Sequence, residues 1–302
     1  MCASEKVSKA GPRGALFLSK SRGLLLFGTA GIPKSTVGTS SIDGIRRIAE
    51  LGLDCLELEF VKGVKMGGDT AEMVGKTARE MEVRLSVHAP YYVNLNAAEE
   101  GKRLASMERL VASARTAEKC GAESVVFHCG YYSKDGTERD REERTFQNIK
   151  RGIGEVVSIL RAERSPVVLR PETMGKKSQF GSLDEILRLC KEVDGLLPCV
   201  DFSHIHAREG GRKANSYRAF DRILRKIGKK LGETALKRMH IHVSGVEYNA
   251  KGEMKHLNLN ESDFRYDEWV QALKDAGVEG TVICESPIQE RDALILKSLY
   301  LS

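Results

Sequence analysis

The chain repeats one pattern, which is clearest in the stretch CGAESVVFH at residues 120–128. A helical run ends at Cys120, Gly121 follows in the place of a left-handed helix cap, and a short apolar, β-branched run leads to His128. This order predicts a buried parallel strand that delivers a polar side chain at its carboxyl end.

Runs of the same kind recur along the chain and alternate with longer amphipathic runs. The expected strands are Leu24–Gly28, Cys55–Phe60, Arg84–His88, Ser124–His128, Pro166–Glu172, Leu197–Phe202, Met239–Val243 and Thr281–Glu285. The expected helices are Ser41–Leu51, Thr70–Met81, Ala97–Cys120, Glu142–Arg164, Leu183–Val193, Ser216–Leu231, Tyr266–Ala276 and Glu290–Leu299. Gly52 and Gly277 follow expected helices, and Asp69 and Ser182 are suitable N-caps. This alternation predicts an α/β fold, a (β/α)8 TIM barrel.

Length and composition favour one domain. The 302 residues, 41% of them hydrophobic, suit a single barrel over residues 23–302. Residues 1–22 are basic, rich in small side chains and too polar for a signal peptide, which predicts a mobile tail. No apolar run approaches the roughly 20 residues that span a bilayer, and the seven cysteines form no CxxC pair. We therefore expect an intracellular monomer, cytoplasmic with a nuclear location left open, without a membrane partner.

The histidines gather where barrel enzymes keep their chemistry. Six of the seven lie at or within four residues of an expected strand end, and the seventh lies in a long loop. They are His88, His128, His204, His206, His240, His242 and His256. Glu172, Asp201 and Glu285 lie at the ends of the fifth, sixth and eighth strands. Buried carboxylates need a compensating cation, and nitrogen and oxygen ligands suit Zn²⁺, with Mn²⁺ or Fe²⁺ as alternatives.

The candidate ligands exceed the needs of one ion, so we predict at least two metals bridged by a carboxylate such as Glu172. A single histidine at a strand end is more often a hydrogen-bonded structural group than a ligand. The convergence of several strand ends favours ligation here. His206 is left out of the ligand set, and Cys129 is expected to be a small buried apolar side chain.

Four short motifs together resemble the endonuclease IV family of abasic-site nucleases. They are Val87-His88-Ala89-Pro90-Tyr91-Tyr92-Val93-Asn94-Leu95, Phe127-His128-Cys129-Gly130, Val200-Asp201-Phe202-Ser203-His204 and Cys284-Glu285-Ser286-Pro287. They resemble the family segments His-x-Ser-Tyr-x-x-Asn-Leu, Phe-His-Pro-Gly, Ile-Asp-Thr-Cys-His and Glu-Thr-Pro. They occur in the family's order on the expected strands, and the resemblance covers the chain from Leu24 to Leu299.

The resemblance implies a zinc-dependent barrel that hydrolyses DNA on the 5′ side of abasic sites in base-excision repair. By this resemblance the first zinc is held by His88 and His128. Glu172 bridges it to a second zinc, completed by Asp201, Glu285 and a histidine of the seventh strand. His204 and His256 hold a third. Metal ions would activate the attacking water. Glu172 and Glu285 would be the catalytic carboxylates, with Glu172 orienting the attacking hydroxide through the metals and Glu285 beside it.

The sequence departs from the family pattern at three places. Where the family has an Asp two residues before the loop histidine, this chain has Met254, with Glu253 as the nearest carboxylate. The loop after Glu172 is one residue shorter. On the seventh strand His240 and His242 face the same side, and spacing favours His240 with His242 as the alternative.

Double-stranded DNA with abasic or damaged sites is the expected partner. The loops after the second and third strands offer Lys62 and Lys65 for phosphates and Tyr91 and Tyr92 as wedges in the minor groove. The two tyrosines could equally close the barrel mouth. The net charge of +6 is compatible with a polyanionic partner.

Two other functions fit parts of the pattern. Sugar-phosphate isomerases and epimerases of the xylose-isomerase-like type share this topology and use Glu, Asp, His and Glu on strands five to eight. They do not need His88, His128, His204 and His256 for a single metal. A barrel that binds metal and nucleic acid without catalysis is the third alternative, raised by Met254.

Overall fold

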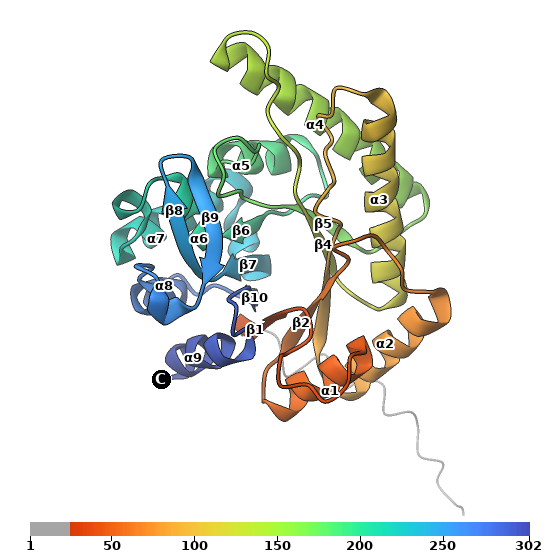
Figure 1. Cartoon of the computed structure of the whole chain (residues 1–302), viewed down its shortest axis with the longest axis vertical. Coiled ribbons are helices and arrows are strands. Elements are labelled where there is room, and N and C mark those ends of the chain that lie inside the picture. Colours follow the sequence, from red (N-terminus) through yellow and green to blue (C-terminus); the bar gives the residue numbers. More distant parts are fainter. Residues whose placement is uncertain (1–24) are drawn as a thin grey trace, which may run out of the picture.

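The computed structural model describes residues 25–302, and the predicted basic tail at residues 1–22 lies outside them (Figure 1). Eight parallel strands form one sheet in the order β5-β4-β3-β2-β1-β10-β7-β6. Their bounds are β1 (Leu25–Ala30), β2 (Cys55–Glu59), β3 (Arg84–His88), β4 (Ser124–Phe127), β5 (Val168–Pro171), β6 (Cys199–Asp201), β7 (Met239–Val243) and β10 (Gly280–Cys284).

The two ends of this sheet meet between β5 and β6. A parallel bridge joins Glu172 to Cys199, and the Thr173 amide donates to the Cys199 carbonyl at 3.1 Å. The sheet therefore curls into a nearly closed barrel. The predicted single-domain (β/α)8 TIM barrel is confirmed.

Helices wrap the outside of the barrel (Figure 1). The α-helices are α1 (Ser41–Glu50), α2 (Gly68–Glu80), α3 (Glu100–Lys119), α4 (Glu138–Ala162), α5 (Leu183–Glu192), α6 (Phe202–Arg208), α7 (Tyr217–Leu231), α8 (Tyr266–Asp275) and α9 (Glu290–Leu301). Three short 3-10 helices are η1 (Arg212–Ala214), η2 (Glu233–Arg238) and η3 (Leu259–Glu261). No helix within residues 25–302 is long and apolar enough to cross a membrane.

Local capping explains where the helices begin. Ser182 caps α5 in a capping box with Glu185, as the sequence predicted. Asp69 was wrongly predicted as a cap, because α2 has Gly67 at its N-cap and Asp69 lies in the first turn, where its charge suits the helix dipole. Helix α4 begins at Glu138 because the Thr137 hydroxyl accepts the Asp140 amide, four residues before the predicted start.

Two elements lie where the sequence indicated loops. Helix α6 begins directly after β6, because the Asp201 carboxylate accepts the His204 amide at 2.7 Å and caps the first turn. The long segment after β7 folds into an antiparallel hairpin of β8 (Gly245–Asn249) and β9 (Gly252–Leu257). Both elements stand at the carboxyl ends of the barrel strands and carry histidines of the site.

The barrel interior is unusually polar and is arranged in two layers. Side chains two residues apart on a strand point the same way, so β2, β3, β5, β6 and β7 each place one polar residue at the mouth and one below it. The mouth layer comprises Glu59, His88, Glu172, Asp201 and His242. The inner layer comprises Glu57, Ser86, Arg170, Cys199 and His240. Arg170 is satisfied without a carboxylate, by Ser124 Oγ at 2.7 Å and the carbonyls of Pro198 and Arg238.

Candidate metal centre

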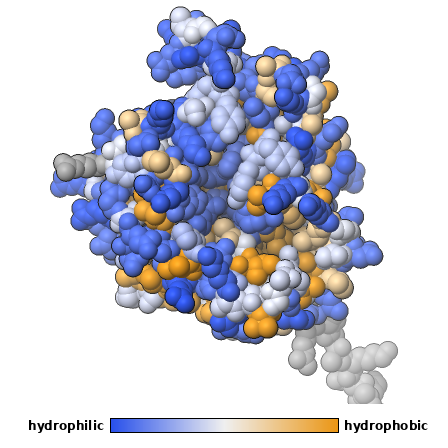
Figure 2. Space-filling model, viewed as in Figure 1, coloured by the Kyte–Doolittle hydropathy of each residue, from blue (hydrophilic) through white to orange (hydrophobic). Residues whose placement is uncertain are grey.

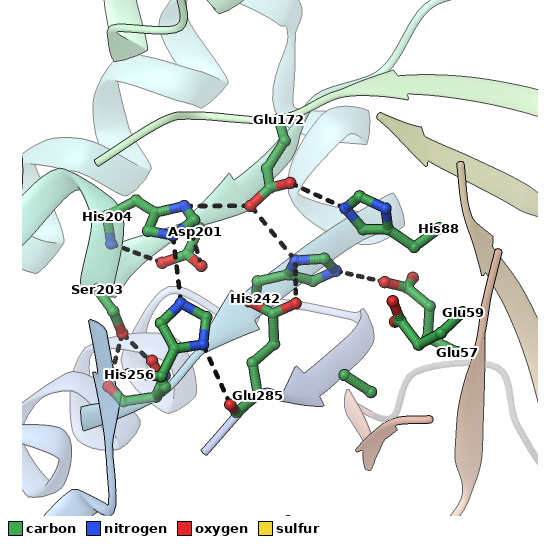
Figure 3. Close-up of polar contacts among 12 residues, drawn as sticks. Glu57, Glu59, His88, Glu172, Asp201, Ser203, His204, His242, His256 and Glu285 are labelled. Atoms are coloured by element: carbon green, nitrogen blue, oxygen red, sulfur yellow. Dashed lines mark hydrogen bonds and ion pairs between the residues drawn. The ribbon is translucent and has the colours of Figure 1, made fainter. Parts of the chain in front are cut away.

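The mouth of the barrel gathers the histidines and carboxylates that the sequence singled out (Figure 3). His88 ends β3, His242 belongs to β7, and Asp201 ends β6. His128, Glu172 and Glu285 each stand one residue beyond a strand. Parallel strands bring all these positions to one end of the barrel.

Glu172 lies at the centre and divides its two carboxylate oxygens between two sets of histidines. Oε2 lies 3.3 Å from His88 Nε2 and 3.1 Å from His128 Nε2. Oε1 lies 3.1 Å from His204 Nδ1 and 3.6 Å from His242 Nδ1. The side chain is 1% exposed. This geometry is that of a carboxylate able to bridge two cations.

The second group joins Glu172 to Asp201, His242 and Glu285. One ligand atom from each of the four lies within 4.8 Å of the others. Asp201 Oδ2 and His242 Nδ1 are buried, and neither has a hydrogen-bond partner among residues 25–302. Buried polar atoms without partners are costly, so the donor set fits a cation at this point.

A third group contains His204, Glu253 and His256. His204 Nε2 lies 3.4 Å from Glu253 Oε2 and 3.5 Å from His256 Nε2. The neighbouring Met254 is 54% exposed, and its sulfur accepts from Asn249 Nδ2 at 3.0 Å. The family pattern has its carboxylate at the position of Met254, and here Glu253, one residue earlier, brings a carboxylate to the group. The bulge in the hairpin after Glu247 accompanies this shift.

The structure places the two strand-seven histidines in different layers. His242, not His240, lies with Asp201 and Glu285, because β7 pairs His242 with Asp201 of β6 and leaves His240 one layer deeper. His240 Nε2 lies 2.9 Å from Glu57 Oε2, and its Nδ1 lies 2.9 Å from Thr281 Oγ1.

Charge governs the electrostatics of the mouth. Burial alone would lower the pKa of His88, but its hydrogen bond to Glu172 and the charges of Glu59 and Glu172 raise it to about 9. Burial alone would raise the pKa of Glu172, but His128, His204 and His242 hold it well below its usual range. Glu172 is therefore an ionised carboxylate. Burial lowers the pKa of His128, which favours the neutral imidazole that metals require.

Two carboxylates on β2, Glu57 and Glu59, were missed by the sequence reasoning. The signal was present in the alternation Leu56-Glu57-Leu58-Glu59, because acidic residues on one face of a buried barrel strand must point inward. Glu59 faces the mouth, and burial, together with the charges of Glu57 and Glu285, raises its pKa to about 7 against the opposing charge of His88.

The residues expected to bind DNA surround the mouth. Tyr91 donates to Glu59 Oε2 at 3.0 Å and its ring stacks on His128 with 5.4 Å between centroids. Tyr91 therefore covers His88 and His128, while 44% of Tyr91 itself is exposed. Tyr92 stacks beneath the Arg109 guanidinium of α3 at 4.6 Å. Lys62 and Lys65 are exposed in the loop after β2.

The two residues left out of the ligand set lie elsewhere. His206 is buried on α6 and contacts Asp263 Oδ1 at 2.8 Å and the Gly211 carbonyl at 3.1 Å. Cys129 is fully buried, and burial raises the pKa of its thiol well above the usual value. Neither residue belongs to the groups of possible ligands found within residues 25–302.

Comparison with known proteins supports this architecture. Residues 45–299 match the family described as xylose isomerase-like TIM barrel. The chain belongs to this family. A protein of Methanocaldococcus jannaschii without an assigned function is 46% identical over 278 residues, which covers 92% of this chain and 97% of that protein. A probable endonuclease 4 of Mycobacterium leprae is 28% identical over 254 residues, covering 83% of this chain and 92% of that protein.

Solved structures of this xylose isomerase-like barrel include both nucleases and epimerases. Endonuclease IV from Thermus thermophilus aligns with a TM-score of 0.67 and 18% identity, over 90% of this chain and 97% of that one. A D-tagatose 3-epimerase-like protein aligns equally well, with 0.67, 21% identity and the same coverage. These likenesses establish the fold alone. The predicted relationship to endonuclease IV is confirmed as that of a divergent member.

Proposed function

We propose that this protein is a zinc-dependent phosphodiesterase that cuts DNA on the 5′ side of abasic sites. The observation that carries the proposal is the division of the Glu172 carboxylate between His88 and His128 on one side and His204 and His242 on the other. An enzyme that needs one metal has no use for such a bridge. Of the four groups of possible ligands within residues 25–302, the three at the barrel mouth support two or three ions per chain.

Bound metal ions would polarise the scissile phosphate, lower the pKa of a water molecule and stabilise the leaving 3′ oxygen. The side chains define where this occurs. Glu172 stays ionised and holds the groups together, while Glu285, with a side chain 10% exposed, reaches the mouth from β10. Tyr91 covers His88 and His128 and limits the access of bulk water.

The surface beside the mouth is suited to a large anionic substrate. A groove of about 1420 Å³ runs along the loops that follow β3, β4 and β5. Its lining has six basic residues, Arg103, Lys134, Arg141, Lys177, Arg208 and Lys213, against four acidic ones, Asp135, Glu138, Glu142 and Glu209. The viewed face of the molecule is mostly hydrophilic (Figure 2). A duplex that enters the mouth could rest on this groove and on Lys62 and Lys65.

A sugar-phosphate epimerase is the second candidate, favoured by one observation. Glu172, Asp201, His242 and Glu285 form by themselves a set of ligands for one divalent ion at the ends of β5, β6, β7 and β10. That reading leaves His128, Glu253 and His256 without a role.

The test is an incision assay on a duplex with one abasic site, run beside elemental analysis of the purified full chain. We expect a single cut on the 5′ side of the lesion and two or three zinc-like ions per chain. One ion per chain, no incision and turnover of a ketose would establish the epimerase instead. Metal without turnover of either substrate would identify a binding protein.

A further inference from the structure

The inner layer of the barrel contains a carboxylate that contacts the back of a candidate ligand. Glu57 lies on β2, two residues below the mouth, and is fully buried. Its Oε1 lies 2.9 Å from His242 Nε2, on the side of the ring opposite the metal-facing Nδ1 (Figure 3). This contact is an ion pair, and within residues 25–302 neither of the two atoms makes a hydrogen bond of regular geometry.

Glu57 is itself held by a defined set of donors. Ser86 Oγ donates to Oε2 at 2.7 Å, and His240 Nε2 lies 2.9 Å from the same oxygen. A carboxylate oxygen accepts, so His240 donates to Glu57 from Nε2, while its Nδ1 lies 2.9 Å from Thr281 Oγ1. The inner layer thus joins Thr281, His240 and Glu57 in one chain of contacts.

We propose that Glu57 is a positioning residue for the metal centre: it fixes the tautomer and orientation of His242 so that Nδ1 faces Asp201, Glu172 and Glu285. A carboxylate behind a metal-binding imidazole orients the ring and strengthens it as a ligand. His240 and Ser86 hold the carboxylate in place. This role rests on the proposed metal centre, but it does not depend on which substrate the centre serves.

An alternative use of the same residues is a metal site of their own. Cys199, His240 and His242 have ligand atoms within 4.8 Å of one another. The hydrogen bonds of His240 on both ring nitrogens argue against it. The burial of Cys199 also raises the pKa of its thiol, which opposes the thiolate that a metal requires.

The test compares two variants of the full chain that each replace one carboxylate. Zn²⁺ affinity is measured by chelator competition on Glu57→Gln and on Glu123→Gln, whose carboxylate lies before β4, away from the mouth, and pairs with Arg84. We expect Glu57→Gln to lose roughly 10- to 100-fold in affinity and Glu123→Gln to stay close to the wild type. Equal losses in both variants would show that only net charge matters, and no loss in Glu57→Gln would show that Glu57 does not act on His242. Either result would overturn the proposal.

Two further measurements keep the test decisive. In the zinc-loaded wild type the His242 Nε2 proton should give a downfield, slowly exchanging resonance that shifts in Glu57→Gln, a signature that a purely structural role would not produce. If Glu57→Gln fails to fold, Ser86→Ala takes its place with a smaller expected loss of affinity, and an unchanged affinity would count against the proposal. In protein loaded with Co²⁺ instead of Zn²⁺, a sulfur-to-cobalt charge-transfer band that disappears in Cys199→Ser would show an inner metal site. That result would overturn the proposal. None of these readouts requires DNA cleavage.

Discussion

At the scale of single residues, the site depends on how one carboxylate is shared. Within residues 25–302 the ion-pair partners of the Glu172 carboxylate are four histidines, which come from β3, α6, β7 and the residue after β4. A substitution of Glu172 therefore changes the contacts of both carboxylate oxygens at once. Its loss should affect two ligand groups at once, whereas the loss of a peripheral ligand should affect one.

Glu172→Gln should therefore weaken two metal sites together and lower incision by several orders of magnitude. The fold should survive, because the substitution keeps the volume and the side chain lies at the barrel mouth. Incision kinetics and metal content are the measurements, with circular dichroism as the control for folding. Near-normal activity in Glu172→Gln would contradict the bridged centre and favour the single-metal isomerase.

Glu59 should make the stability of the metal-free protein depend on pH. Its pKa is raised from 4.5 to about 7, so between these values the folded chain binds more protons than the unfolded chain. Stability is then fully present below the lower value and falls as the pH rises through the window. Thermal unfolding of chelator-treated protein is measured between about pH 4 and about pH 8. As the pH rises, the stability of the wild type should fall more steeply than that of Glu59→Gln. Parallel profiles for the two proteins would show that Glu59 is not held protonated.

At the scale of elements, the β8–β9 hairpin completes the site from outside the barrel. It is tied to the loop after β5 by the Glu253 amide, which donates to the Gly175 carbonyl at 3.3 Å. Gly252 makes this close approach possible, because its φ is +99° and an added Cβ would lie 2.1 Å from the Gly175 carbonyl oxygen. The hairpin therefore places Glu253 and His256 opposite His204.

Glu253→Gln should remove about one metal equivalent per chain, since it deletes the only carboxylate among the described members of the third ligand group. Met254→Gln is the matched control, because it changes the adjacent residue, which points to solvent, and should keep the full metal content. His256→Ala should resemble Glu253→Gln, and all three should retain more incision activity than Glu172→Gln. Elemental analysis beside the incision assay decides this, and a metal loss in Met254→Gln would speak against the assignment of Glu253.

At the scale of the whole molecule, exposed lysines lie at both ends of the barrel, but only those at the mouth are placed to contact a substrate there. The net charge of +6 is modest, but Lys62 and Lys65 lie in the loop after β2, at the same end of the barrel as the metal centre. Lys229 and Lys230 are equally exposed in the last turn of α7. Helices of a barrel end at the opposite face from the strand ends, so these two lie away from the mouth.

DNA binding should weaken with salt, because lysines that neutralise phosphates release counterions. Replacing Lys62 and Lys65 together by Gln should lower the slope of log affinity against log salt by about 2. The double replacement of Lys229 and Lys230 alters net charge equally and should leave the slope unchanged. Fluorescence anisotropy with an abasic duplex measures both. A wild-type affinity that hardly changes with salt would refute the role of the β2 loop.

What the sequence by itself determined was the barrel and the end of it at which the candidate ligands gather. Alternating apolar and amphipathic runs report backbone periodicity, a local property, and strand ends of a parallel barrel converge wherever the chain goes. That reasoning was sufficient to predict His88, His128, Glu172 and Asp201 together at the mouth, where the structure has them.

Only the tertiary structure decided the rest, because it depended on register and on contacts between distant segments. The choice of His242 over His240 follows from the pairing of β7 with β6, which shifts a side chain by one layer and is not encoded in the spacing of the strand itself. Glu253 enters the site only because a hairpin docks on the loop after β5. Glu57 contacts His242 because β2 lies across the barrel from the end of β7. Packing between elements, which no local pattern reports, sets these three positions.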